Sequence, residues 1–153
     1  MNTLPRITQL VEDTDFEIEA KFESLFTQGF QSQGILIEQD DLNVLRIEFH
    51  RVNADFKVFA ASIFGGSYRI RVMKKITATQ PMYLRVRRDG NLWRVFYSYD
   101  DTTWITATTF TQMMTVTRIG VYAGNSADTP HTAVVDYFFN TASPIIPEDP
   151  ENT

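Results

Sequence analysis

Residues 82–99 read MYLRVRRDGNLWRVFYSY, and this stretch decides the fold class. Every second residue from Met82 to Val86 is apolar, and a two-residue period is typical of a β-strand with one buried and one wet face. Asp89-Gly90-Asn91 then supplies a short turn, and an aromatic-rich run continues to Tyr99. Because a turn of this composition between two such runs favours a hairpin, the stretch predicts a pair of antiparallel strands.

The same alternation recurs along the chain, with turn residues between the runs. Further strands are predicted at Phe16–Phe22, Gly34–Gln39, Leu45–Phe49, Phe56–Phe64, Tyr68–Val72, Thr103–Phe110, Val116–Ala123 and Thr132–Phe139. In the Tyr68–Val72 run, the apolar residues are expected to face the core and the two arginines to face water. Asp41–Ser62 lacks Gly and Pro and is the one helical competitor, but its apolar residues recur at steps of two. Closely spaced strands of this kind predict an all-β sandwich of two antiparallel sheets.

Length and composition exclude several classes of protein. The chain has 153 residues, which suits one domain. It contains no cysteine, so a disulfide framework, a thiolate nucleophile and a Cys-ligated metal site are excluded. Two histidines are too few for a three-histidine metal centre. No run of about 18 consecutive apolar residues occurs, so no membrane span is predicted.

Composition changes after Asn140. Residues 141–153 read TASPIIPEDPENT, which holds three of the six prolines and no aromatic residue. Such a segment is typical of a linker. The sequence therefore predicts a packed domain at residues 5–140 and an acidic, Pro-rich linker tail at residues 141–153, which we expect to lead into another module of a larger parent protein.

Charge is unevenly distributed along the chain. The formal net charge is −5, yet the segment from Arg46 to Arg94 holds 11 basic and 3 acidic residues. The rest of the chain holds 3 basic and 16 acidic residues. Two interpretations stay open: a solvated sheet face with acidic ends, or a surface for an anionic partner such as an acidic polysaccharide.

No catalytic constellation stands out in the sequence. Nucleotide-binding glycine motifs, a Gly-x-Ser-x-Gly elbow and zinc-binding histidine spacings do not occur. His50 and His131 are interpreted as surface or hydrogen-bonded histidines, and the chain is expected not to be an enzyme. A structural calcium ion is a secondary hypothesis, although no diagnostic calcium-binding loop occurs in the sequence. The side chains that could supply the oxygen ligands preferred by calcium are Asp40, Asp41, Asn43, Asp100, Asp101 and Thr102.

Binding is the function that the residue types favour. Polysaccharide recognition uses flat aromatic rings that stack on sugar C–H faces, together with charged or amide groups that bond hydroxyls. The candidate carbohydrate-binding residues are Arg46, Glu48, Arg69, Arg71, Tyr83, Arg85, Arg87, Trp93, Tyr97 and Tyr99. The last three share one parity of their strand, so all three face solvent or all three face the core, and both alternatives stay open.

Three segments resemble concanavalin A-like sandwich domains of bacterial secreted proteins. Residues 34–49, GILIEQDDLNVLRIEF, look like a sequence block of these domains, and residues 83–104 are similar to their Arg-rich hairpin. Residues 118–124 with residues 135–138 resemble their closing strand pair. The resemblance spans about Pro5 to Phe139. Asp101 stands where these domains have a turn glycine, so that turn is expected to take another geometry.

The resemblance implies a jelly-roll sandwich of the accessory type attached to family 43 glycoside hydrolases. Such a domain binds a polysaccharide or oligosaccharide, or supports the glycosidase, without catalysis. It also implies neighbouring modules of the parent chain as partners, no nucleic acid or membrane, and an extracellular or cell-surface location. Two other functions stay open: a structural or adhesion module of a large surface protein and, ranked below it, a small glycan hydrolase or lyase.

Overall fold

The computed structural model describes residues 5–25, 31–125 and 131–143, and every regular element in these ranges is a β-strand. The strands are β1 (Arg6–Leu10), β2 (Phe16–Phe22), β3 (Gln31–Asp40), β4 (Asn43–Val52), β5 (Asp55–Phe64), β6 (Ser67–Lys75), β7 (Met82–Asp89), β8 (Leu92–Ser98), β9 (Trp104–Thr111), β10 (Arg118–Asn125) and β11 (Val135–Asn140). The predicted all-β class is confirmed. The stretch Asp41–Ser62, for which a helix was the alternative, forms β4 and most of β5. None of the described residues belongs to a helix that could span a membrane.

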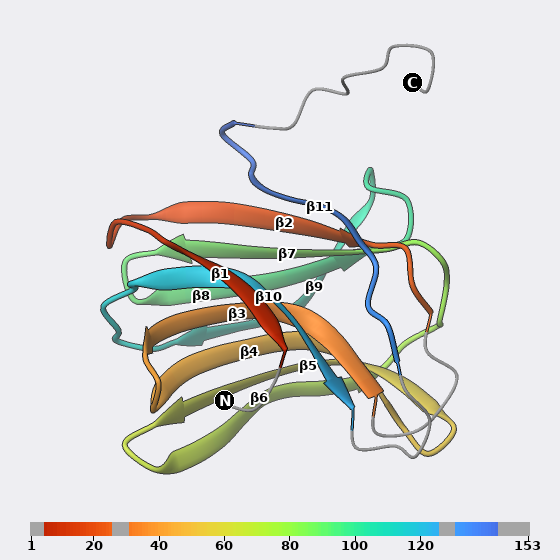
Figure 1. The fold of residues 1–153 in the computed structure, drawn as a ribbon, viewed down its shortest axis with the longest axis horizontal. Helices are drawn as coiled ribbons and strands as arrows, with labels where there is room; N and C mark the ends of the chain where they lie inside the picture. The colour runs from red at the N-terminus through yellow and green to blue at the C-terminus, as the bar shows by residue number, and fades with distance from the viewer. Residues whose placement is uncertain (1–4, 26–30, 126–130, 144–153) are drawn as a thin grey trace.

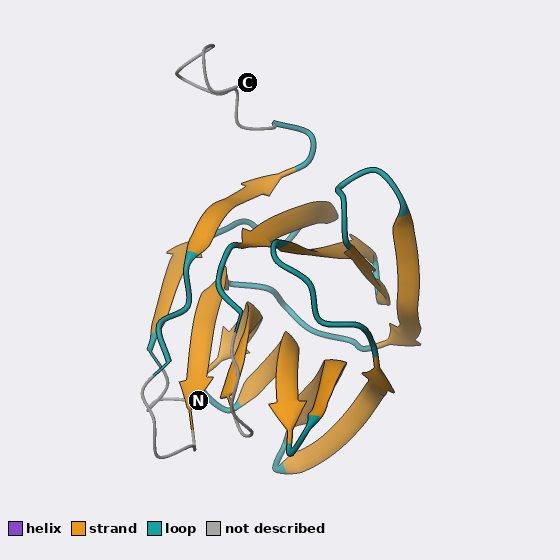
Figure 2. Cartoon of the chain, turned by 90° about the vertical axis from the view of Figure 1, so that its right-hand side faces the viewer, coloured by secondary structure: helices purple, strands orange, loops and turns teal. Residues whose placement is uncertain are grey.

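The strands form two antiparallel sheets that pack as two layers (Figure 1). Sheet A has the strand order β1-β10-β3-β4-β5-β6, and sheet B has the order β11-β2-β7-β8-β9. In Figure 1 sheet B is the upper layer and sheet A the lower one. The turned view in Figure 2 shows strands joined by loops throughout the described chain. The chain crosses between the layers several times, so neighbours in a sheet are often distant in sequence, and the predicted sandwich of two antiparallel sheets is confirmed.

The core fills the space between the two layers. Alternate side chains of a strand point to opposite faces of a sheet, so each strand places its apolar set of alternate side chains in the core. Burial of these side chains is the main favourable contribution to folding, at about 25 cal/mol per Å² of apolar area removed from water. The largest side chains with less than 2% exposure include Trp93, Phe22, Phe49, Ile18, Ile35, Ile37, Leu45, Ile47, Met82 and Leu84.

Trp93, Tyr97 and Tyr99 turn toward this core rather than toward solvent. Trp93 is 0% exposed and Tyr97 is 3% exposed. The Trp93 indole nitrogen donates to the carbonyl oxygen of Gln112 at 3.0 Å, and Tyr99 packs against the core cluster. A ring enclosed on both faces cannot stack on a sugar, so the prediction of Trp93 and Tyr97 as carbohydrate-binding residues is wrong, and Tyr99 shares their inward parity.

A β-bulge reverses the expected orientation at the start of β6. Ala60 pairs with Val72 and Ala61 pairs with Ile70, which leaves Arg71 as the extra residue. Tyr68 and Ile70 consequently lie on the outer face, with 53% and 49% of their area exposed. The expectation that these two residues face the core is wrong, because one inserted residue shifts the alternation of side chains by one step.

The Asp100-Asp101-Thr102 turn places Asp101 in a backbone conformation that glycine favours. Asp101 has a φ of 63°, in the left-handed region where glycine is favoured and aspartate is tolerated. The Ser98 hydroxyl accepts the backbone N–H groups of Asp100 and Asp101 at 3.2 and 3.0 Å. These bonds hold Asp101 in this conformation, and the expected difference from the turn of the related domains stays a prediction.

β11 ends at Asn140, and the described chain continues to Ser143. Residues 144–153, most of the predicted linker tail, lie outside the described residues. The domain bounds 5–140 and 141–153 therefore stay a prediction.

Candidate functional site

The candidate arginine and tyrosine residues divide between the two sides of the sandwich. Arg46 and Glu48 lie on the outer face of sheet A, because they alternate along β4 with residues whose side chains point into the core. Tyr83, Arg85 and Arg87 lie on the outer face of sheet B. Because the two outer faces point in opposite directions, these residues do not form one surface for a glycan chain.

A buried carboxylate organises the outer face of sheet A. Glu48 on β4 is 1% exposed. Its Oε1 accepts Arg46 Nη2 at 2.7 Å and also accepts the hydroxyl of Tyr122 on β10. Its Oε2 lies 3.1 Å from His50 Nδ1. We call Arg46, Glu48, His50 and Tyr122 the Glu48 cluster.

Strand register explains how Tyr122 reaches Glu48 from two strands away. Tyr122 on β10 pairs with Gly34 on β3, and Gly34 pairs with Glu48 on β4. Since Gly34 has no side chain, the space between Tyr122 and Glu48 stays open. A Cβ atom on Gly34 would lie 2.7 Å from Glu48 Cα, which is closer than van der Waals contact allows. The same row of positions continues to Arg6 on β1 and Phe59 on β5.

The cluster holds its carboxylate in the charged form. Burial opposes ionisation of Glu48, but the hydrogen bond from His50, the charge of Arg46 and the hydrogen bond from Tyr122 together outweigh it, so the pKa of Glu48 is lowered. Burial and the nearby negative charge of Glu48 raise the pKa of Tyr122 well above its ordinary value. The phenol of Tyr122 therefore stays neutral and donates to an ionised Glu48.

Two nitrogens of the Glu48 cluster keep unused hydrogen-bonding capacity. Arg46 Nε and His50 Nε2 are buried and have no hydrogen-bond partner within residues 5–25, 31–125 and 131–143. The side chains that carry them keep 22% and 13% of their area exposed, so both atoms lie just beneath the surface. A buried polar group without a partner costs about 1–3 kcal/mol, and native proteins retain few of them. A ligand that bonds to these nitrogens would recover that free energy.

An apolar rim lies beside the cluster on β6. It consists of Tyr68, Ile70 and Met73, which are 53%, 49% and 45% exposed. Burial of the Tyr68 hydroxyl raises its pKa, and the charges of Arg46 and Glu48 also act on it in opposite directions. Tyr68 is thus within electrostatic range of the cluster, and about half of its area remains accessible. The outer face of sheet A thus combines a buried polar floor with an exposed aromatic and apolar rim.

Sheet B carries a comparable cluster around a second buried carboxylate. Glu19 on β2 is 1% exposed. It accepts Arg85 Nε at 3.0 Å on one oxygen and the Tyr137 hydroxyl at 2.7 Å on the other. The Arg85 guanidinium lies 4.0 Å from the centre of the Trp104 ring. We call Glu19, Arg85, Trp104 and Tyr137 the Glu19 cluster. Its buried polar atoms all have partners in the described part of the chain, so it ties β2 to β7 and β11.

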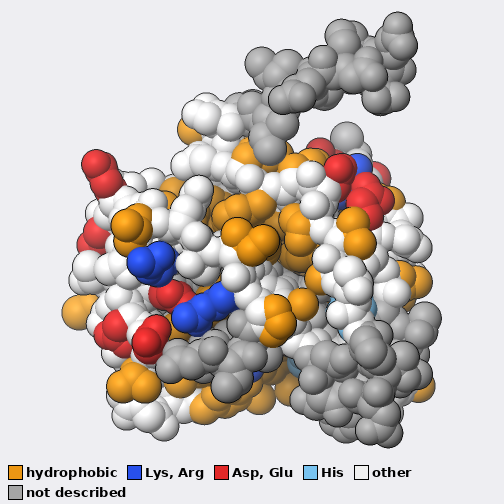
Figure 3. Space-filling view, viewed as in Figure 1, with side chains coloured by type: hydrophobic (Ala, Val, Ile, Leu, Met, Phe, Trp, Pro, Cys, Tyr) orange, Lys and Arg blue, Asp and Glu red, His pale blue; other side chains and the backbone are white. Residues whose placement is uncertain are grey.

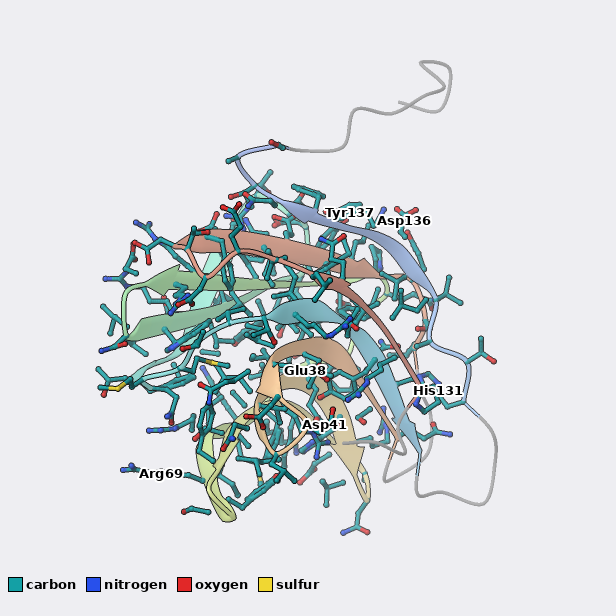
Figure 4. All side chains as sticks on the ribbon, turned by 60° about the vertical axis from the view of Figure 1, so that its left-hand side comes forward. Glu38, Asp41, Arg69, His131, Asp136 and Tyr137 are labelled. Carbon is teal, nitrogen blue, oxygen red and sulfur yellow. The ribbon has the colours of Figure 1, made fainter. Side chains whose placement is uncertain are left out.

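The remaining candidate arginines serve the fold or point into solvent. Arg71 donates to Ser62 Oγ and to Gln112 Oε1, each at 3.0 Å, and its guanidinium lies 4.8 Å from the centre of the Phe110 ring. These contacts join β6 of sheet A to β9 of sheet B. Arg69 points away from the body of the protein (Figure 4).

Basic and acidic residues that are segregated in the sequence are mixed in space. Arg88 from the basic middle pairs with Asp13 from an acidic flank at 2.6 Å, and Arg87 pairs with Asp89 at 3.0 Å. Figure 3 shows Lys and Arg side chains beside Asp and Glu side chains on the face in view, without a separate basic patch. In Figure 4 Glu38 and Asp41 lie close together, at the corner where both pair with Arg6. This mixing favours the interpretation of the charges as a solvated surface.

The turns that offered hard oxygens use them internally. Asp100 Oδ1 accepts the backbone N–H groups of Thr102 and Thr103 at 3.0 and 2.9 Å. These bonds lower the pKa of Asp100 to about 2. Asp40 Oδ1 accepts Leu42 N at 2.9 Å in the same manner. No group of three His, Cys, Asp or Glu side chains that could hold a metal ion occurs among the described residues.

Two hollows occur on the surface of the described chain. One of about 310 Å³ lies between β1 and the approach to β11, and its lining includes Ile7, Val121, Val135 and Tyr122 of the Glu48 cluster, so it borders the outer face of sheet A. The other, of about 410 Å³, is lined by Asp15, Arg87 and Asp89 among others, at the far end of sheet B. The first is mainly apolar, and in the second Arg87 and Asp89 already pair with each other. The outer face of sheet A is therefore the candidate functional site.

Five residues of this site were absent from the residues proposed from the sequence: His50, Tyr68, Ile70, Met73 and Tyr122. His50 carried a usable signal, because it shares the outward parity of Arg46 and Glu48 on one strand. Tyr68 was misassigned through the bulge in β6. Tyr122 is 74 positions from Glu48, and nothing in the spacing joins them.

Comparisons with known proteins address the fold. The structure resembles a xylan β-1,4-xylosidase from Bacillus halodurans C-125, with a TM-score of 0.76 and 16% sequence identity, over 89% of this chain and 29% of that one. It also resembles the GH43 protein BlXynB from Bacillus licheniformis, with a TM-score of 0.71 and 15% identity, over 90% of this chain and 33% of that one. The fold is the concanavalin A-like β-sandwich. No family model and no curated protein matches the sequence.

The sandwich spans about a third of the length of these GH43 proteins. It also matches a tetrameric galectin from the ball sponge Cinachyrella, with a TM-score of 0.64 and 11% identity, over 89% of this chain and 99% of the galectin. The resemblance predicted from the sequence is confirmed at the level of the fold. Identities of this size carry no residue-by-residue assignment, so the function rests on the geometry of the site.

Proposed function

We propose that this chain is a non-catalytic carbohydrate-binding module of a secreted, multimodular glycan-degrading enzyme, and that it binds a polysaccharide or oligosaccharide on the outer face of sheet A. The observation that carries the proposal is the Glu48 cluster with its two unpartnered nitrogens, Arg46 Nε and His50 Nε2. Sugar hydroxyls both donate and accept hydrogen bonds, so a glycan can satisfy both nitrogens.

The rim of the site supports the same ligand class. Tyr68 exposes 53% of its area beside the cluster, and Ile70 and Met73 extend the apolar strip. An accessible tyrosine ring can stack on the C–H face of a sugar, while the polar floor bonds its hydroxyls. In the Glu19 cluster, by contrast, both carboxylate oxygens of Glu19 already accept hydrogen bonds from Arg85 and Tyr137.

The geometry favours binding over catalysis. A general acid in glycoside hydrolysis needs a carboxyl group with a raised pKa, whereas the pKa of Glu48 is lowered. The pKa of Glu19 is raised by burial, but Arg85 and Tyr137 enclose its two oxygens. The sandwich matches only about a third of two longer proteins, which supports neighbouring modules of a parent chain as partners. An extracellular or cell-surface location is part of the same proposal.

Calorimetric titration against a panel of plant and bacterial glycans tests the proposal. Wild-type protein is expected to bind at least one glycan, and Tyr68→Ala and His50→Ala are each expected to weaken that binding about tenfold, which corresponds to about 1.4 kcal/mol. Tyr83→Ala is the matched control, since it removes a half-exposed tyrosine ring from the outer face of sheet B. Urea unfolding of each variant shows that the fold is retained.

Two results would overturn the proposal. Binding of no glycan in the panel would favour the structural or adhesion module instead. An equal loss of affinity in Tyr83→Ala would move the site to sheet B.

A further inference from the structure

Each sheet of the described sandwich has two edge strands, and three of the four are irregular. β6, β9 and β11 each show a register shift against the neighbouring strand. Such bulges disrupt the regular row of backbone groups that a further strand needs for pairing. β6 also carries the exposed charges of Arg69 and Lys74, and it packs against β9 at the same side of the sandwich. These three edges are therefore protected against pairing with another chain.

The fourth edge, β1, is regular and apolar. It lies beside β10 at the end of sheet A, and its register with β10 has no shift along its whole length (Figure 1). Residues 7–9 at its centre are uncharged, and Arg6 already pairs with Glu38 at 2.6 Å. Ile7 and Leu10 expose 78% and 72% of their area. A regular edge with exposed apolar side chains is a template for pairing with a further strand.

The hydrogen bonds between β1 and β10 show which backbone groups of β1 face the open edge. Ala123 N donates to Pro5 O, and Val11 N donates to Thr117 O, each at 3.1 Å. Backbone groups alternate in direction along a strand, so the odd-numbered residues of β1 direct theirs toward β10. Thr8, at the centre of β1, consequently directs its N–H and its carbonyl oxygen away from the sheet.

We propose that β1 is a self-association edge, which pairs antiparallel with β1 of a second copy of this chain about a two-fold axis at Thr8. In this register Thr8 lies opposite the partner's Thr8, and Arg6 lies opposite the partner's Leu10. The outward-directed backbone groups of both strands then meet as hydrogen-bonded pairs. The axis is perpendicular to the sheet, so the two copies of sheet A form one continuous sheet with their outer faces on the same side.

Symmetry explains why a second copy suits this edge. A two-fold axis brings each surface against itself, so a charge close to the axis meets an identical charge and is repelled. β1 has only uncharged side chains at residues 7–9, whereas β6 would bring Lys74 close to a second basic side chain. Pairing also removes part of the exposed area of Ile7 and Leu10 from water, which favours association. This association does not depend on glycan binding, so failure of either proposal leaves the other in place.

Sedimentation equilibrium of the full chain measures the association. The wild type is expected to show a monomer–dimer equilibrium with a dissociation constant of about 100 µM, because a short strand pair forms a small interface. A dimer of this strength dissociates readily, so β1 also exists as an open edge in solution. Thr8→Lys sets two positive charges opposite each other at the axis and is expected to weaken association about tenfold or more. Thr109→Lys, which changes an exposed threonine on edge strand β9, is the matched control and is expected to leave association unchanged.

A second measurement tests the register, because the chain contains no cysteine of its own. Thr8→Cys places its thiol opposite the thiol of the second copy, with Cα atoms about 5.5 Å apart, a distance that a disulfide spans. With oxidised glutathione, Thr8→Cys is expected to form covalent dimers about tenfold faster than Thr109→Cys at the same concentration, since only Thr8 is held at the axis.

Every outcome supports or overturns the role of β1. A wild type that stays monomeric at about 500 µM, well above the expected dissociation constant, overturns the inference. Association that Thr8→Lys leaves intact, or that Thr109→Lys weakens to the same degree, places the contact elsewhere and also overturns it. Equal rates of covalent dimer formation in the two cysteine variants overturn the register at Thr8. Urea unfolding of each variant shows that the fold is retained.

Discussion

Glu48 shows how a single residue can hold a charge inside this sandwich. Removal of a carboxylate from water costs several kcal/mol, and only good partners offset that cost. Arg46, Tyr122 and His50 supply those partners, and they approach from both carboxylate oxygens. The same bonds orient Arg46 and His50, so one residue fixes both the local stability and the geometry of the candidate binding site.

Replacement of this carboxylate tests that dependence. Glu48→Gln is expected to lower the free energy of unfolding by about 3 kcal/mol, because Arg46 is left at a largely buried position without its counter-charge. Urea denaturation at neutral pH measures the change. Asp55→Asn is the control, since the Lys75–Asp55 pair is exposed and its loss is expected to cost less than about 1 kcal/mol. Equal effects of the two substitutions would contradict the structural role of Glu48.

Asp100 provides a prediction about pH at an exposed turn. Backbone N–H groups of Thr103 and Thr102 lower its pKa from 3.8 to about 2. Because the folded-state pKa is depressed, the stabilisation is present above pH 4 and is lost as the pH falls toward 2. Asp100→Asn keeps an acceptor oxygen but removes the charge, so its unfolding free energy is expected to fall less than that of the wild type between pH 4 and pH 2.

The titration of Asp100 itself can be observed directly. Carbon-13 NMR of the side-chain carboxyl group is expected to give a midpoint near 2 in the folded protein. A midpoint close to 3.8 would show that the turn amides do not hold the carboxylate.

Individual elements were predictable from the alternation of residues, but their irregularities were not. The hairpin of β7 and β8 follows from its period and from the Asp-Gly-Asn turn, and Gly90 takes the positive φ that this turn needs. In β6 the same reasoning fails, because the bulge at Arg71 depends on pairing with β5 and not on the composition of β6. A strand read alone cannot show that its partner skips a residue, and so Tyr68 was assigned to the wrong face.

β3 gives an element-scale prediction through Gly34. Gly34→Ala is expected to lower the free energy of unfolding by about 1–3 kcal/mol or more, because the added Cβ would lie 2.7 Å from Glu48 Cα in a sheet that cannot move apart locally. Differential scanning calorimetry or urea denaturation measures the loss. Ser67→Ala, at the exposed start of β6, is the control and is expected to change the free energy of unfolding by less than about 0.5 kcal/mol. An unchanged midpoint for Gly34→Ala would contradict the close approach of β3 and β4.

At the scale of the whole molecule, the sequence predicted the layers but not their membership. Arg46 on β4 and Arg85 on β7 occupy the same kind of outward position in similar alternating runs, yet they lie on opposite faces of the sandwich. Which strands share a sheet depends on long-range pairing, which local periodicity does not encode. The charge segregation along the chain could not decide between its two interpretations for the same reason, since crossovers between the sheets bring acidic flanks beside the basic middle.

The sheet order makes a final prediction about how the molecule opens. β4 lies inside sheet A between β3 and β5, and Leu45 and Ile47 on it are 0% exposed. β1 is an edge strand, and Ile7 on it is 78% exposed. Because edge strands lose fewer contacts on opening, the hydrogen-bonded amides of β1 are expected to exchange with deuterium at least tenfold faster than those of β4, whose exchange should require global unfolding. NMR-detected hydrogen exchange measures both, and equal protection of β1 and β4 would show that the sandwich opens only as one unit.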